Sequence, residues 1–361
     1  MTLRRMKSKK VAMHHKFVEC SSIGHIWIDQ NDIERYSHLW YDEVQLIREL
    51  SMGKLHKTSI GGQAIYEGVM MRGPKKYSVA IRLPDGTIKT EVHFNKSIKD
   101  RYKLFKLPIL RGISGLFESL ALGYKTLLYS FEKAGLEEGE PSKFDLWLEK
   151  VFGKATTKVI VVIGAVLGVV LALGLFSYLP SLGVKLASGI IPKWARSIVE
   201  GLIKIAVFVI YLAAASKMPD IERTFEYHGA EHKTIFTYEE GAELTVEEVR
   251  KRKRFHPRCG TSFILIVLVI SIIVSSLPII TWENALIRAI TKLAFLPLIV
   301  GISYEIIHVA GKYDNIVTRT ISAPGMWLQR ITTREPNDEE IEVAIAAMIP
   351  VLTGNPEDDK W

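Results

Sequence analysis

The chain has 361 residues, of which 48% are hydrophobic and 24% charged, and its mean hydropathy is +0.15. This length allows two or three structural units at roughly 100–200 residues each, and the segregated composition excludes a disordered chain, a collagen-like repeat and a single soluble globule. The net charge of +8 calls for an anionic partner, either nucleic acid or lipid, while two cysteines, Cys20 and Cys259, exclude a disulfide framework and fit a reducing compartment.

The N-terminal residues contain one readable element. Residues 1–57 are rich in histidine, lysine and aromatic residues without clear periodicity, so we expect an extension of unknown role there. No signal peptide is predicted, because no apolar segment follows the charged first residues. Within a cytoplasmic region at 58–103, Tyr77–Phe94 alternates apolar and polar residues around a Pro-Asp-Gly turn, which predicts a β-hairpin. The glycines of Ile60–Pro74 indicate a turn packed against the membrane part; a phosphate-binding loop is disfavoured because no Lys-Ser/Thr follows.

Residues 104–136 are predicted to contain an amphipathic helix. Charged residues recur there every seven positions, at Arg111, Glu118, Lys125 and Glu132, and most residues between them are apolar or small. A seven-residue spacing keeps the four charges on one helical face. We expect this helix to lie in the membrane interface or to pack on spanning helices with one polar stripe, and a fifth full span is the weaker alternative.

Four apolar stretches are long enough to cross a bilayer, which takes about 20 residues. They are Val159–Leu179, Ile198–Ser216, Ser262–Ile280 and Ile287–Val309. Two of them carry no charge and approach full bilayer length, which argues against buried helices of a large soluble protein. The sequence therefore predicts a mainly α membrane protein with about four transmembrane helices, in 143–216 and 262–309, and a small α+β N-terminal part.

The distribution of lysine and arginine predicts the orientation of these spans. Basic residues concentrate in the loop 217–261 and in the tail 310–361, and are fewer in the segments 180–197 and 281–288. Because basic loops stay on the cytoplasmic side, we expect a multi-pass protein of the cell membrane, plasma or inner, with both termini and the middle loop in the cytoplasm.

A basic run within the middle loop is the first candidate for membrane-surface binding. It follows a capping box at Thr245–Glu248 and is expected to be a solvated helix end that attracts anionic headgroups. Nucleic-acid binding is disfavoured. The run consists of Arg250, Lys251, Arg252, Lys253 and Arg254.

The same loop holds the motif YHGAEHK at Tyr227–Lys233. On a helix, His228 and His232 project from one face and could bind one ion, and Glu231 beside them could polarise a metal-bound water. This H-x-x-E-H order is the inverted zinc-protease pattern, in which the glutamate is the general base. Gly229 weakens the helix by about 1 kcal/mol relative to alanine.

A third ligand has three candidates, which the predicted topology brings to the same membrane face. Glu305 is preferred, because a downstream carboxylate resembles the third ligand of inverted zinc-protease motifs and because a glutamate at membrane depth needs a partner. His256 and Cys259 bind zinc more strongly, but Pro257 and Gly260 suggest a turn that points them elsewhere. The expected cofactor is a divalent metal, with zinc preferred.

Four motifs resemble the YqhQ-like family of bacterial multi-pass membrane proteins. They are GGQAIYEGVMMRGP (61–74), YHGAEHKTI with the residues that follow (227–250), HPRCGTSF (256–263) and GMWLQRITTREPNDEEIEVAI (325–345). Members of this uncharacterised family are commonly labelled predicted metal-dependent enzymes, so the resemblance, over about residues 58–350, implies a metal but no substrate. Members begin near the GGQ motif, so residues 1–57 are an extension, or translation starts near Met52.

The sequence as a whole favours a membrane-embedded metal-dependent hydrolase, such as a peptidase, with its site at the cytoplasmic membrane face. The alternative is a non-enzymatic scaffold or assembly factor whose polar cluster is structural. A lipid- or ion-handling transporter is weaker, because the four spans show no evident internal repeat. The expected partners are the lipid bilayer and a protein substrate or membrane protein.

Overall fold

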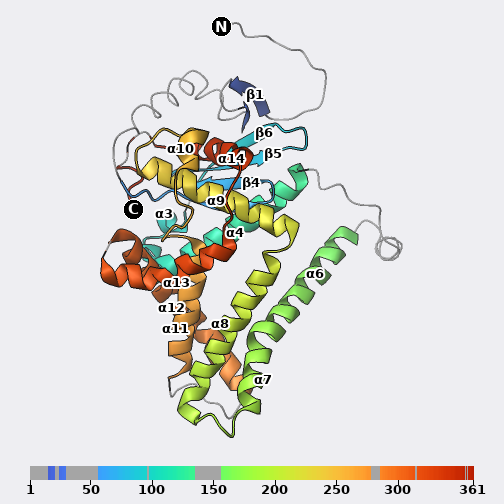
Figure 1. Cartoon of the computed structure of the whole chain (residues 1–361), viewed down its shortest axis with the longest axis vertical. Helices are drawn as coiled ribbons and strands as arrows, with labels where there is room; N and C mark the ends of the chain where they lie inside the picture. The colour runs from blue at the N-terminus through green and yellow to red at the C-terminus, as the bar shows by residue number, and fades with distance from the viewer. Residues whose placement is uncertain are drawn as a thin grey trace.

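The structure is a computed structural model. It describes residues 15–20, 24–29, 56–95, 97–134, 156–277, 285–313, 315–353, 355 and 357–361. The described residues form a sheet with helices packed on it, and a group of long apolar helices that extends away from that part (Figure 1).

A six-stranded sheet has the strand order β1-β2-β6-β5-β4-β3. Its strands are β1 (His15–Cys20), β2 (Gly24–Asp29), β3 (Gly61–Ile65), β4 (Gly68–Arg72), β5 (Lys76–Arg82) and β6 (Ile88–Phe94). Neighbouring strands are antiparallel except β2, which runs parallel to β6. The β5–β6 hairpin confirms the predicted one, and Gly86 in its turn has a φ of 82°, which favours glycine. Two strands, β1 and β2, come from the predicted N-terminal extension.

The hairpin of β3 and β4 was not predicted, because its two-residue turn lacks the usual turn residues. Glu67 occupies the left-handed region with a φ of 51°, an uncommon conformation for a residue other than glycine. Its carboxylate accepts hydrogen bonds from Arg223 (2.7 Å) and from the Tyr227 hydroxyl (3.2 Å), both on helix α9 (Pro219–Glu239). Contacts with a distant helix therefore hold this turn.

Helices cover both faces of the sheet. Side chains alternate along each strand, so Val69 and Met71 of β4 pack with α9 and α14 (Asp338–Met348), whereas Met70 faces α4 (Leu110–Lys133). Helix α4 confirms that the predicted segment is helical, and it lies on the sheet face opposite α9. The other described helices outside the long apolar ones are α3 (Ile98–Arg101), η1 (Lys103–Lys106), α10 (Val246–Arg250), α13 (Ile316–Thr332) and η5 (Ile349–Val351).

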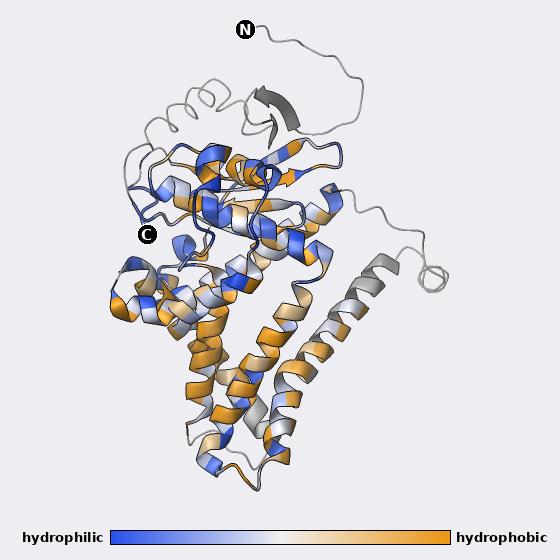
Figure 2. Ribbon diagram, in the orientation of Figure 1, coloured by the Kyte–Doolittle hydropathy of each residue, from blue (hydrophilic) through white to orange (hydrophobic). Residues whose placement is uncertain are grey.

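Among the described residues, three helical segments are long and apolar enough to cross a membrane: Val166–Leu186, Lys193–Ala215 and Ile290–Lys312. The helices concerned are α6 (Thr156–Leu173), the π-helical η3 (Gly174–Tyr178), α7 (Leu179–Leu186), η4 (Lys193–Ala195), α8 (Arg196–Ala215) and α12 (Ala285–Lys312). Figure 2 shows hydrophobic residues concentrated on these helices and on α11 (Gly260–Ser275). The structure is consistent with a membrane protein.

The predicted third span forms a shorter helix than expected. Helix α11 has 16 residues and is therefore about 24 Å long, against about 30 Å for a hydrocarbon core. Residues 278–280, with which the predicted span ends, lie outside the described residues. Glu200 of α8 lies inside the predicted second span and is paired there, because it accepts a hydrogen bond from Lys292 of α12 at 2.9 Å.

Candidate metal centre

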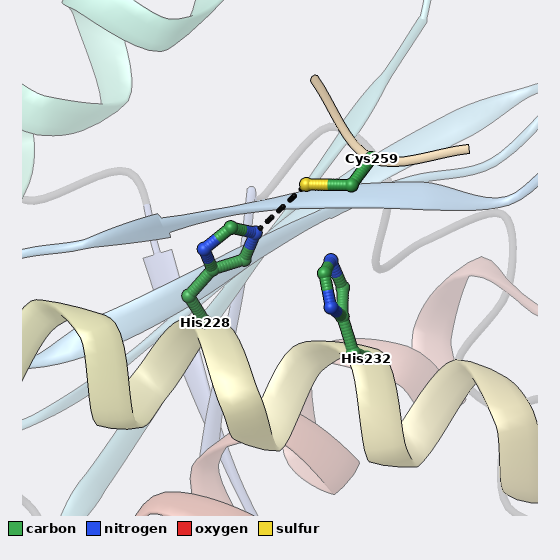
Figure 3. A group of neighbouring side chains, drawn as sticks. All are labelled: His228, His232 and Cys259. Atoms are coloured by element: carbon green, nitrogen blue, oxygen red, sulfur yellow. Dashed lines mark hydrogen bonds between the residues drawn. The ribbon is translucent and has the colours of Figure 1, made fainter. Parts of the chain in front are cut away.

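Helix α9 carries the two predicted histidine ligands on one face. The helix begins at Pro219 and has Asp220 and Glu222 in its first turn, where a proline and acidic side chains favour helix initiation. The imidazole rings of His228 and His232 lie 4.4 Å apart, centroid to centroid, and point to the same side of the helix (Figure 3). The expected i, i+4 geometry is confirmed.

Cys259 joins the two histidines from the start of α11. The residue is the N-cap of that helix, and its Sγ lies 3.2 Å from Nε2 of His228. Each of these three residues offers one ligand atom, and the three atoms lie within 4.8 Å of one another. Tetrahedral zinc binds nitrogen at about 2.0–2.1 Å and thiolate sulfur at about 2.3 Å, which places its donor atoms about 3.3–3.6 Å apart. The three side chains would therefore have to move slightly closer together to hold one ion.

Two backbone carbonyls orient the imidazoles for ligation. Nδ1 of His228 lies 2.8 Å from the carbonyl oxygen of Thr332, and Nδ1 of His232 lies 2.5 Å from that of Arg254. A carbonyl oxygen only accepts hydrogen bonds, so both Nδ1 atoms donate, and Nε2 is the atom of each ring that is left to face a metal. Such bonds fix the tautomer and the ring direction of metal-binding histidines.

Gly229 allows the chain that follows α13 to approach helix α9. A Cβ at this position would lie 2.0 Å from the carbonyl oxygen of Arg334, and the Arg334 N–H donates to the carbonyl of Phe225 at 2.8 Å. The chain that leaves α13 therefore runs directly against α9 and brings Thr332 to His228. The glycine that weakens α9 locally is required by this contact.

The loop that carries Cys259 is fixed by a buried amide. Gln329 of α13 accepts a hydrogen bond from the His256 N–H and donates to the His256 carbonyl, each at 2.7 Å. At the other end of this loop, Nζ of Lys233 donates to the carbonyl of Arg250 at 3.0 Å. Gln329 and Thr332 were not predicted as site residues, although both lie in the motif at 325–345.

Glu231 is buried beside the three donor atoms. Its carboxylate accepts a hydrogen bond from the backbone N–H of Gly62 in β3, and its Oε2 has no hydrogen-bond partner among the described residues. A Cβ on Gly62 would lie 2.8 Å from Cδ of Glu231, which confirms close packing as the reason for glycine there. Burial raises the pKa of Glu231, against the opposing charges of His228 and His232.

The protonation states of Cys259 and His228 depend on each other. Burial alone would raise the pKa of the Cys259 thiol, but His228 and His232 outweigh burial and hold it well below 9.0. Burial alone would lower the pKa of His228, but the charge of Cys259 outweighs burial and raises it to about 9. A thiolate is the form of cysteine that binds metals, so this environment favours the ligating form of Cys259.

The other two candidate ligands do not join the group. Glu305 of α12 accepts hydrogen bonds from the guanidinium of Arg111 (2.7 Å) and from the Ile109 N–H (3.2 Å), so this structure does not bring the preferred third ligand to His228 and His232. The ring of His256 lies 5.6 Å from that of His232, but its Nε2 faces Glu239 at 3.7 Å. Burial lowers the pKa of His256 to about 4, so it stays neutral.

Most residues of the basic run at 250–254 form ion pairs with acidic residues of the protein. Four of its five members form ion pairs: Arg250 with Asp338, Lys251 with Glu248 at 2.5 Å, Arg252 with Glu240 at 2.8 Å, and Arg254 with Glu335 at 3.1 Å. Helix α10, at the start of the run, lies on the far side of α9 from the apolar helices (Figure 1). This placement does not favour the predicted contact with headgroups.

Comparisons with known proteins agree with the resemblance seen in the motifs. The family described as "Protein of unknown function (DUF1385)" matches residues 107–353. A relative, "Uncharacterized protein YqhQ" of Bacillus subtilis (strain 168), is 36% identical over 297 residues, which are 81% of this chain and 92% of the relative. No solved structure matches the chain.

Proposed function

The chain belongs to the DUF1385 family, and we propose that it is a metal-dependent hydrolase whose site lies at the membrane surface. The observation that carries this proposal is the convergence of His228, His232 and Cys259 within 4.8 Å, next to the buried Glu231. Two imidazoles and a thiolate suit zinc. The site lies at the start of the apolar helix α11, which we place at the cytoplasmic face of the cell membrane.

Three protein donors favour catalysis over a purely structural role. Structural zinc sites have four protein ligands, whereas catalytic sites have three and keep one position for water or substrate. The unpartnered Oε2 of Glu231 lies beside this group, where a water held at that position could donate to it. A zinc ion bound by these residues would polarise a substrate carbonyl and lower the pKa of the attacking water.

Glu231 acts as the general base. The Gly62 N–H holds its carboxylate in place, and burial moves its pKa upward, toward the neutral range in which proton transfer is efficient. The carboxylate accepts the proton of the attacking water and passes it to the leaving group. An amide bond needs this protonation of its nitrogen, so a peptide is the favoured substrate.

A scaffold with a structural metal site is the second candidate. Its support is burial: Glu231, His232 and Cys259 are 4%, 2% and 7% exposed, which leaves little room for a substrate in this conformation. The two candidates differ in whether the fourth position of the metal exchanges its ligand. Acetohydroxamate added to the cobalt-loaded protein shifts the visible spectrum if the position exchanges, and leaves it unchanged if the site is closed.

The replacement Glu231→Gln tests the catalytic role. Purified protein in lipid nanodiscs is incubated with detergent-solubilised membrane proteins from the source cells, and new peptide N-termini are identified by mass spectrometry. We expect the wild type to produce new termini and Glu231→Gln to produce none while keeping the same metal content, because an amide cannot accept the proton. Equal cleavage by the variant, or no cleavage by the wild type, would contradict the hydrolase proposal.

A further inference from the structure

Helix α4 has its apolar side facing outward. Five large apolar side chains on one stripe are between 38% and 65% exposed: Phe117, Leu120, Tyr124, Leu128 and Phe131. The buried positions of the same helix are small or polar: Gly112, Ser114, Gly123, Thr126 and Ser130. A surface helix of a soluble protein shows the opposite pattern, with apolar residues toward the core.

Part of the charged stripe of α4 explains this arrangement, because Arg111 and Glu118 face the protein, whereas Lys125 and Glu132 are exposed. Glu118 accepts a hydrogen bond from Arg72 of β4 at 2.6 Å, and Lys125 lies 3.4 Å from the hydroxyl of Tyr77 in β5. At the start of the helix, Arg111 pairs with Glu305 of α12. Three of the four charges are therefore used in contacts of α4 with the sheet and α12, and the large apolar side chains of Phe117–Phe131 are left outside.

Helix α13 repeats the pattern. Its exposed apolar side chains are Ile316, Val317, Ile321 and Trp327, between 39% and 78% exposed. Its buried positions are again mostly small or polar: Thr318, Ser322, Gly325, Leu328, Gln329 and Thr332. Gly325 packs so closely on α11 that a Cβ there would lie 2.4 Å from Oγ of Ser262. Two separate helices thus expose apolar stripes while packing through small residues.

The segment Ile98–Pro108, directly before α4, combines exposed apolar and basic side chains. Tyr102, Leu104 and Leu107 are between 51% and 60% exposed. The exposed basic residues beside them are Lys99, Arg101, Lys103 and Lys106, with Asp100 as the single acid. Apolar side chains that insert among headgroups, flanked by cations, are typical of surfaces that bind anionic bilayers.

These three elements lie together at the ends of the apolar helices. Ile109, at the start of α4, packs on Gly301 of α12, where a Cβ would lie 2.3 Å from the isoleucine side chain. Figure 1 shows α4 and α13 between the sheet and the free ends of the apolar helices. The exposed stripes are thus continuous with helices long enough to span a membrane.

We propose that Ile98–Pro108, α4 and α13 form a membrane-interface collar. The apolar stripes of α4 and α13 enter the acyl region of the leaflet next to the sheet, and the cations of Ile98–Pro108 bind its anionic headgroups. Lipid is the occupant because the stripes adjoin the apolar helices and carry neighbouring cations, whereas an exposed apolar surface of this extent is unfavourable in water. This proposal requires no metal and no catalytic activity.

Spin labels on the full-length protein in nanodiscs of phosphatidylcholine and phosphatidylglycerol test the collar. Single cysteines replace Phe117 and Leu120 on α4 or Ile321 and Trp327 on α13, in a Cys20→Ser background that is also measured without added cysteine to account for Cys259. The controls are Lys251→Cys and Glu342→Cys, exposed positions on the sheet part. Collisions with oxygen, which concentrates in lipid, are compared with collisions with a water-soluble nickel complex.

We expect labels on both helices to collide more with oxygen than with nickel, and the two controls to show the reverse. A water-like ratio on either helix, in purified protein without a partner, would remove that helix from the collar. The headgroup contact is tested with a label at Tyr102. Its nickel accessibility should fall when phosphatidylglycerol is added, and the fall should disappear when Lys99, Arg101, Lys103 and Lys106 are replaced by Gln. The same change at Lys75, Lys251, Lys253 and Lys360 should have no effect, and equal behaviour of the two sets would overturn the headgroup contact.

Discussion

The replacement Gly229→Ala tests how the candidate site is assembled. The new Cβ would lie 2.0 Å from the Arg334 carbonyl oxygen, so the chain after α13 must move away from α9. The overpacking costs about 1–3 kcal/mol, and the two hydrogen bonds lost, from His228 to the Thr332 carbonyl and from the Arg334 N–H to the Phe225 carbonyl, cost about 1 kcal/mol each. Alanine regains about 1 kcal/mol of helix propensity. The expected net loss is about 2–4 kcal/mol of unfolding free energy.

Denaturant unfolding of the detergent-solubilised protein measures this loss, and a metal titration measures the effect on the site. Because His228 loses the carbonyl that orients it, metal affinity should fall about 10–100-fold. Gly115→Ala on α4 is the matched control, since a Cβ there meets nothing within 4 Å, and it should leave affinity unchanged and stability equal or higher. If Gly229→Ala behaves like this control, α13 does not pack against α9 as described.

Three further replacements separate the roles of neighbouring residues. Gly62→Ala should keep the metal but lower hydrolysis about 100-fold, because the new Cβ displaces the Glu231 carboxylate and small misplacements cost that much; unchanged turnover would contradict it. Glu305→Ala should leave metal content unchanged and lower stability by about 1–3 kcal/mol through the unpaired Arg111, and metal loss would restore Glu305 as a ligand. Burial would raise the pKa of Glu239, but a neighbouring histidine and arginine outweigh it and keep the pKa below 4.5. The stabilisation that ionised Glu239 contributes to the fold is therefore present above about pH 4.5 and is lost as the pH falls further. The variant Glu239→Gln should therefore show a weaker dependence of unfolding free energy on pH in that range. Identical curves for variant and wild type would refute this role of Glu239.

Local patterns predicted the elements that depend on few neighbours. The hairpin of β5 and β6 follows from alternation around Gly86, and the shared face of His228 and His232 follows from helix geometry alone. Glu231 could be placed beside them for the same reason. The apolar helices were also predictable, since length and composition decide them, although the shorter α11 shows that the extent of each was not.

Tertiary contacts decided what the sequence could not. The turn at Glu67 depends on Arg223, 156 residues away, so no local turn signal marks it. The choice of third ligand depended on Arg111, which takes Glu305. The charged stripe of α4 predicted one polar face, but only the structure shows that Arg111 and Glu118 on this face are turned toward the protein. In each case a pairing between distant residues, absent from any local pattern, set the outcome.

Metal analysis of the purified protein tests the central proposal most directly. We expect about one divalent metal ion per chain, with zinc preferred, and, after exchange for cobalt, the charge-transfer absorption of a thiolate–cobalt bond. That absorption should vanish in Cys259→Ser, and His228→Ala and His232→Ala should lose the metal, more so at lower pH, because a ligating imidazole must be unprotonated. A wild-type protein without stoichiometric metal, or metal retained equally in all three variants, would contradict the proposed centre.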